Sequence, residues 1–198
     1  TNDGYVYWQG TSMAAPVVSG AVALVAEQFP WMTNKNLATT ILTTGSRAAS
    51  PDAEWGRGLL NVGKAIQGPG IFEEDFSANV TAGYASTFSN DISGTAGLIK
   101  QGAGSLALTG NNSYTGNTYL NGGTLVAYQE ANLGNTASAL RFDGGTLKFG
   151  ANFTLTRGLL LGAQGGTLDL NGHTKIQNSP ISGSGRFGVT GGGSFTLD

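Results

Sequence analysis

Apolar residues recur every three or four positions in the first 70 residues, and this spacing predicts helices. The longest run predicts a helix over Ser12–Phe29. A second run predicts a helix over Asn34–Thr44, with Thr33 or Asn34 as its N-cap and Gly45 as the glycine that ends it. The first helix is apolar on most of its sides, so we expect it to lie buried in a larger core.

A different pattern follows residue 70: short segments in which apolar and polar residues alternate, separated by glycine turns. The four-residue motif GGTL, called a word below, occurs three times at spacings of 22 and 21 residues, in Gly122–Leu125, Gly144–Leu147 and Gly165–Leu168. Related words stand at Gly104–Leu108 and Gly192–Leu197. A period near 20 with strand-like alternation predicts an all-β, right-handed parallel β-helix whose rungs stack on one another. An antiparallel meander competes with it, because stretches such as Asn135–Phe149 fit hairpin spacing.

The two patterns meet near Gly68-Pro69-Gly70, which is a turn sequence. Just before it, Trp55–Ile66 predicts a glycine turn and a short helix. We therefore expect a helical part over residues 1–68, a connector over 69–95 and the β-helix over 96–198. The connector holds the acidic run Glu73-Glu74-Asp75, which we interpret as solvated, with calcium binding as a minor alternative.

Composition removes several classes of function. The 198 residues include 10 Lys+Arg and 12 Asp+Glu, for a net charge of −2, so no basic footprint for nucleic acid is present. The absence of cysteine excludes disulfides, thiolate metal sites and a cysteine nucleophile. The most apolar stretch, 14–26, is too short to span a bilayer. No motif predicts a cofactor or a metal. The start and end of the sequence lead us to expect an internal piece of a longer protein.

The strongest chemical signal is Gly10-Thr11-Ser12-Met13-Ala14-Ala15-Pro16. Ser12 stands at the entry to the first predicted helix, where free backbone N–H groups and the positive end of the helix dipole can stabilise an oxyanion. Gly10 permits close approach of a ligand, and Pro16 is tolerated early in a helix. The motif departs from the G-x-S-x-G nucleophile elbow at Ala14, which disfavours an α/β-hydrolase.

GTSMAAP followed by VVSGAVAL resembles the nucleophile segment of subtilisin-like serine proteases, the subtilases. The stretch Gly56–Val62 resembles the sequence that closes the domain in that family, so the likeness covers about residues 1–67. It implies an α/β subtilase fold and Ser12 as the catalytic nucleophile. It also implies a catalytic Asp, a catalytic His and an oxyanion-hole Asn earlier in the protein. Val17 stands where many subtilases have a non-catalytic His. Tyr7, Trp8 and Gln9 are candidates to line a substrate groove.

Residues 98–116, continuing to Leu125, resemble the autotransporter-associated β-strand repeat, and Gly165–Thr174 resembles a second form of it. Together with a subtilase end, this pair resembles the passenger of a subtilisin-like autotransporter. The likeness implies a secreted or surface-exposed protein of a Gram-negative bacterium with protein or peptide substrates. It further implies two partners in the same chain: the earlier half of the protease and a later outer-membrane β-barrel. Zero cysteine suits export through an oxidising periplasm.

Two other functions remain open at this stage. The first is a non-catalytic β-helical adhesin or stalk with a degenerate protease domain. The second is a carbohydrate-active β-helix, for which Asp143 and Asp169 would be the paired carboxylates, although their spacing of 26 residues is not one repeat. The single histidine, His173, is interpreted as a turn residue and not as a general base. The aromatic residues of the repeats are interpreted as core and stacking residues: Tyr114, Tyr119, Tyr128, Phe142, Phe149 and Phe153.

Overall fold

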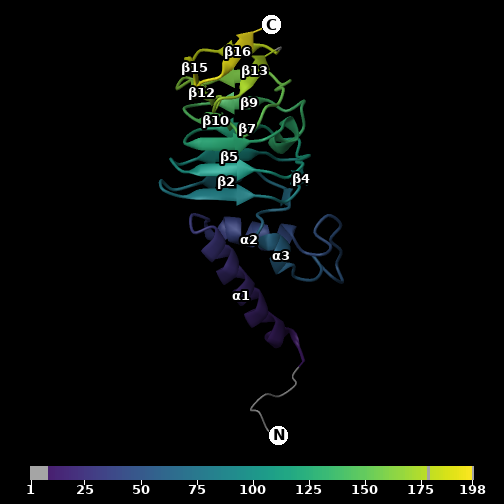
Figure 1. Cartoon of the computed structure of the whole chain (residues 1–198). Coiled ribbons are helices and arrows are strands. Elements are labelled where there is room, and N and C mark those ends of the chain that lie inside the picture. The colour runs from purple at the N-terminus through teal and green to yellow at the C-terminus, as the bar shows by residue number, and fades with distance from the viewer. Residues whose placement is uncertain (1–8, 178, 198) are drawn as a thin grey trace.

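The computed structural model describes residues 9–177 and 179–197. A small helical part stands at one end of a stack of parallel strands (Figure 1). Helix α1 runs away from the stack, whereas α2 and α3 lie beneath its first coil. No helix within the described ranges combines the length and the apolar character that crossing a bilayer requires.

The three helices are α1 (Thr11–Gln28), α2 (Asn34–Thr43) and α3 (Val62–Ala65). Thr33 is the N-cap of α2, because its side chain accepts a hydrogen bond from the Asn36 N–H at 3.2 Å and the Asn36 side chain accepts from the Thr33 N–H. We expected Gly45 to end α2 as a glycine in the left-handed region, but its backbone φ is not positive. It is glycine for another reason: a Cβ there would collide with the carbonyl of Arg57.

Twelve strands form two parallel six-stranded sheets, so the predicted parallel β-helix is confirmed. The first sheet, in spatial order, contains β2 (Phe76–Asn79), β5 (Leu98–Gln101), β7 (Thr118–Leu120), β9 (Leu140–Phe142), β11 (Leu159–Leu161) and β14 (Ile181–Gly183). The second contains β3 (Ala85–Phe88), β6 (Ser105–Leu108), β8 (Thr124–Ala127), β10 (Thr146–Phe149), β12 (Gly166–Asp169) and β15 (Phe187–Thr190).

The third side of the stack is less regular. Two short parallel pairs lie there: β1 (Ile71–Phe72) with β4 (Ser93–Gly94), and β13 (Thr174–Gln177) with β16 (Ser194–Leu197). Between them runs the 3-10 helix η1 (Glu130–Leu133). Every strand pairing among the described residues is parallel, so the antiparallel meander is wrong.

The GGTL words coincide with strands of the second sheet and stack in register. Leu106 pairs with Leu125, Leu125 with Leu147, and Leu147 with Leu168. All four leucine side chains are fully buried, and so is Phe149, which lies in the next inward column. The alternation read from the sequence therefore predicts which side chains face the core. The coils stack because one coil cannot bury its apolar face without its neighbours.

The segment expected to be a connector holds the first coil of the β-helix. Strand β2 pairs with β5 and β3 pairs with β6, each in a continuous register of four residues. Its buried side chains Phe76, Ala78, Val80 and Phe88 alternate as they do in later coils. The segment has no GGT word, so the repeat pattern used to find the other coils does not detect it.

Aromatic and ionic contacts join this first coil to the helices. Phe29 packs edge to face on Phe88 with ring centroids 5.4 Å apart, and the Trp31 indole N–H donates to the Ser86 hydroxyl at 2.8 Å. Arg57 makes two hydrogen bonds to the Glu73 carboxylate, at 2.6 and 2.9 Å. The acidic run is exposed, as expected, and it also makes contacts: Glu73 holds the glycine turn before α3. Its neighbours Glu74 and Asp75 accept from Lys35 and from the Gly97 N–H.

Cations are buried inside the β-helix. Lys100 lies in the inward column between Ala78 and Leu120, and its ammonium donates to the carbonyls of Gln101, Gly102 and Gly122 at 2.9, 3.1 and 3.0 Å. These carbonyls belong to the corners of two successive coils, so one side chain ties the coils together. Arg157 acts similarly on the third side, where it donates to the Leu133 and Gly134 carbonyls.

The stability of the β-helix should rise between pH 8 and pH 10. Burial lowers the pKa of both Lys100 and Lys175 to about 8, whereas an unfolded chain keeps lysine protonated to about pH 10.4. In this window the unfolded state binds more protons than the folded state, so the free energy of unfolding increases with pH. Urea unfolding at both pH values measures the rise, which should be smaller in Lys100→Met. An equal rise in both proteins would contradict this account.

Candidate active site

The candidate nucleophile lies at the N-terminal end of α1. Gly10 is the N-cap, with φ 138°, and helical hydrogen bonding begins with the Met13 N–H donating to the Gly10 carbonyl at 3.0 Å. No side chain caps this helix end. Ser12 is the second helical residue and is exposed. Its backbone N–H is among the first N–H groups of the helix, which have no partner within the helix. The position predicted for Ser12 relative to its helix is thus the position the structure gives it.

Pro16 lies in the second turn of the helix, whereas proline is tolerated best in the first. The helix begins at Thr11, so Pro16 is its sixth residue, inside the helix. A residue with an N–H at this position would donate to the Ser12 carbonyl, and proline cannot. The Ser12 carbonyl therefore lacks the donor four residues later that a regular helix would supply.

Most of α1 is exposed, in contrast to the buried helix that its sequence predicts. Only Ala21 and Val25 are buried, whereas 62% of Val17 and 50% of Leu24 are accessible. A hollow of about 460 Å³ lies between α1, α2 and residues 57–60, with apolar side chains along it. Exposed apolar surface of this kind is typical of a face that another protein segment covers.

The other residues considered from the sequence do not assemble around Ser12. His173 lies in the turn between β12 and β13, near the end of the stack farthest from α1 (Figure 1). Gln9 is exposed, and Tyr7 and Trp8 lie outside the described residues. Among residues 9–177 and 179–197, no group of three or more His, Asp or Glu could hold a metal ion.

Asp143 and Asp169 have separate structural partners. Asp143 accepts a hydrogen bond from the Gln164 N–H at 2.8 Å, after the first sheet. Asp169 belongs to the second sheet and pairs with Lys148 at 3.5 Å. The two aspartates belong to different sheets, so they do not form the paired carboxylates of a carbohydrate-active site.

The aromatic residues of the repeats divide between the core and the surface. Tyr114, Phe142 and Phe149 are buried, and Phe153 stacks on Phe149 with centroids 4.7 Å apart. Tyr119 is half-buried, and Tyr128 is 44% exposed. The core interpretation thus holds for four of these rings.

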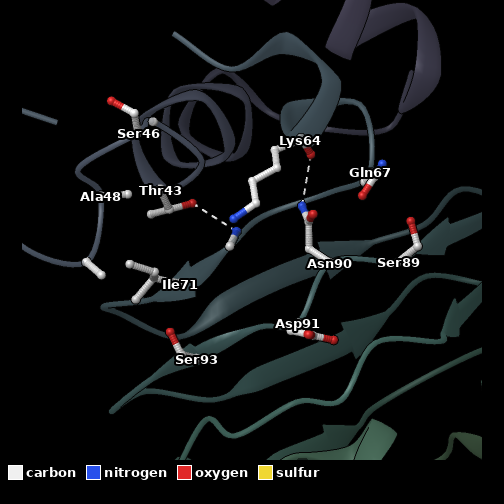
Figure 2. A pocket seen from close by; sticks show the side chains of 13 residues that line it. Thr43, Ser46, Ala48, Lys64, Gln67, Ile71, Ser89, Asn90, Asp91 and Ser93 are labelled. Carbon is white, nitrogen blue, oxygen red and sulfur yellow. Dashed lines mark hydrogen bonds between the residues drawn. The ribbon is translucent and has the colours of Figure 1, made fainter. Parts of the chain in front are cut away.

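A second cleft, of about 410 Å³, lies where the helical part meets the first coil. Figure 2 shows Lys64 extending across it from α3, with Thr43 on one side and Asn90 and Asp91 on the other. The Asn90 amide donates to the Lys64 and Gly68 carbonyls at 2.9 and 2.6 Å, which fixes α3 on the β-helix. The cleft contains hydroxyl groups but no histidine, so it holds no serine–histidine pair for nucleophilic chemistry.

Two segments of the chain match different protein families. Residues 1–70 match the subtilase family, and residues 98–127 match the passenger-associated-transport-repeat. The Neisserial autotransporter lipoprotein NalP of Neisseria meningitidis serogroup B is 42% identical over 183 residues, which cover 88% of this chain. Both parts of the chain match a subtilase autotransporter. The resemblances drawn from the serine motif and from the repeats are thereby confirmed.

Two further relatives match over shorter stretches. An extracellular serine protease of Serratia marcescens is 35% identical over 163 residues, covering 63% of this chain and 16% of that protein. The adhesin BmaC autotransporter of Brucella suis biovar 1 is 42% identical over 108 residues, covering 54% of this chain and 3% of that protein. This chain spans 15% of the length of the Neisseria relative. The subtilase match thus covers the helical part of the chain, and the repeat match lies in the β-helix.

Proposed function

We propose that Ser12 is the nucleophile of an exported serine endopeptidase whose protease domain is carried on the β-helix. The observation that supports this most strongly is the position of Ser12, exposed at an uncapped helix N-terminus, within the GTSMAAP motif of a segment matching the subtilase family. A serine placed there has a free hydroxyl and a backbone N–H beside it. These are the two groups that acyl transfer requires from a nucleophile segment.

The proposed reaction follows the serine-protease scheme. A histidine from an earlier part of the protein takes the proton of the Ser12 hydroxyl as Oγ attacks the peptide carbonyl carbon, and an aspartate orients that histidine. The Ser12 N–H and an asparagine side chain stabilise the oxyanion. The histidine then gives the proton to the leaving amine, and water releases the acyl group from Ser12. The exposed face of α1 at Val17, with the hollow beside it, is where the rest of the protease domain would pack.

The β-helix would act as a stalk for this domain. The proposed protein is secreted or displayed at the surface of a Gram-negative bacterium, tethered through an outer-membrane β-barrel later in the same chain. Protein or peptide substrates are its proposed targets. The first coil starts at Ile71 and is hydrogen-bonded to α2 and α3, so the stalk would hold the protease domain through a packed interface and not through a loose linker.

A fluorophosphonate probe tests the proposal, because it reacts only with an activated serine. In the full-length protein, peptide mapping should place the adduct on Ser12. The 198-residue chain alone should stay unlabelled and should not cleave casein, because its single histidine is the distant His173 and a serine without a base is a weak nucleophile. An adduct on a different serine would contradict the proposal, and so would Ser12-dependent casein cleavage by the short chain.

The alternative is a β-helical adhesin or stalk with an inactive protease domain. The similarity of 108 residues of this chain to an adhesin autotransporter favours it to that extent. The same labelling experiment distinguishes the two functions, since an inactive domain leaves Ser12 unlabelled in the full-length protein.

A further inference from the structure

A hollow of about 450 Å³ lies on the outer face of the first six-stranded sheet. Its floor is formed by the outward-facing middle residues of successive strands: Tyr119 pairs with Arg141, and Arg141 pairs with Leu160. Along the edge of the sheet, Asn121 and Asp143 carry side chains, whereas Gly162 in the next coil carries none. The missing side chain opens the hollow between neighbouring coils.

Arg141 lies against Tyr119 in this hollow. Its guanidinium carbon lies 5.9 Å from the centroid of the Tyr119 ring, a cation–π contact. Within residues 9–177 and 179–197, no ion pair or hydrogen bond engages its guanidinium, and its Nε is buried without a partner. Buried polar groups normally have partners. The planar fork of arginine is the protein group best matched to a carboxylate, which it binds through two parallel hydrogen bonds.

Asp143 supplies the opposite chemistry at the edge of the same hollow. One carboxylate oxygen accepts from the Gln164 N–H at 2.8 Å, and the other has no hydrogen-bond partner among the described residues. A Cβ on Gly162 would lie 2.7 Å from that first oxygen, so glycine is what allows the carboxylate to stand there. A free carboxylate oxygen accepts hydrogen bonds from hydroxyl groups, and the neighbouring Asn121 amide can both donate and accept.

We propose that this hollow binds a uronate unit of an acidic polysaccharide. A uronate ring carries one carboxylate for Arg141, hydroxyl groups for Asp143 and Asn121, and C–H faces that can contact Leu160. Its size suits the hollow, which lies within the range of small-ligand sites. The middle strands β7, β9 and β11 are already hydrogen-bonded on both sides, so they offer no free edge to add a peptide strand. Recognition here therefore depends on side chains, which favours a saccharide over a peptide.

Isothermal titration of the chain with trigalacturonate tests the site, with the fully methyl-esterified trimer as the matched neutral ligand. We expect a dissociation constant of about 1 mM or tighter for the acid, and binding at least about tenfold weaker for the ester, because the ester cannot form the bidentate ion pair. Absence of binding at a trigalacturonate concentration about tenfold above this dissociation constant overturns the proposal. Equal binding of the two trimers also overturns it.

Variants locate the binding on the surface. Arg141→Gln should weaken trigalacturonate binding at least about tenfold, and Asp143→Asn should weaken it about threefold while keeping the acceptor for the Gln164 N–H. Lys148→Gln removes a positive charge from the other sheet and should change the constant less than twofold. If Arg141→Gln fails to fold, Ser184→Phe fills the hollow from an exposed turn and should abolish binding. Undiminished binding by a folded Arg141→Gln or Ser184→Phe protein rules the site out.

Discussion

Replacing Ser12 by alanine should lower kcat for casein cleavage by the full-length protein about 10⁴-fold or more. The substitution removes the oxygen that forms the acyl bond, while the helix start keeps its backbone N–H groups. Alanine is also a good helix former, so α1 should persist. The measurement compares initial rates of casein cleavage at equal concentrations of folded protein.

Ser19→Ala is the matched control. Ser19 lies in the same helix, is exposed, and uses its hydroxyl to donate to the Ala15 carbonyl at 3.1 Å. Its loss should change the rate less than about threefold, because surface substitutions of this kind alter stability only slightly. A Ser12→Ala protein that retained its activity would place the nucleophile elsewhere.

The second large effect concerns the core of the β-helix. Leu147→Ala should destabilise the chain by about 2–5 kcal/mol, the range for leucine truncation in a packed core. Leu147 is fully buried and stacks between Leu125 and Leu168 in the adjacent coils. The cavity would therefore weaken the contacts of one coil with both neighbours. Urea unfolding followed by circular dichroism measures the change.

Lys148→Ala provides the comparison at the next position. Lys148 faces outward on the same strand and makes only a partly exposed ion pair with Asp169, at 3.5 Å. Its removal should change the free energy of unfolding by less than about 1 kcal/mol. Equal destabilisation by the two variants would mean that the inward and outward faces of β10 are not distinguished by packing.

The regular part of the β-helix was predictable because its words repeat at nearly constant spacing. Leu125, Leu147 and Leu168 could be placed in one column from the sequence alone. The first coil could not, since β2 and β3 bury Phe76 and Phe88 without a GGT word. The role of Lys100 could not be predicted either. Alternation gives it an inward position, yet a lysine there is stable only because three corner carbonyls accept its hydrogen bonds.

The candidate site was predictable in part. The motif places Ser12 at a helix start, because the small and apolar residues that follow it specify the helix. The pairing of Arg141 with Tyr119 and Leu160 could not be read from the sequence. Successive coils differ in length between 19 and 22 residues, so outward neighbours become evident only from the strand register.

The geometry around Ser12 in the full-length protein is the most direct test of this account. A crystal structure that includes the complete protease domain should place the Ser12 Oγ within about 3.2 Å of a histidine ring nitrogen. That histidine should hydrogen-bond to an aspartate on its other side, and the exposed face of α1 should be covered. A structure in which no imidazole can reach the Ser12 hydroxyl would contradict the account and leave the β-helix as the functional part.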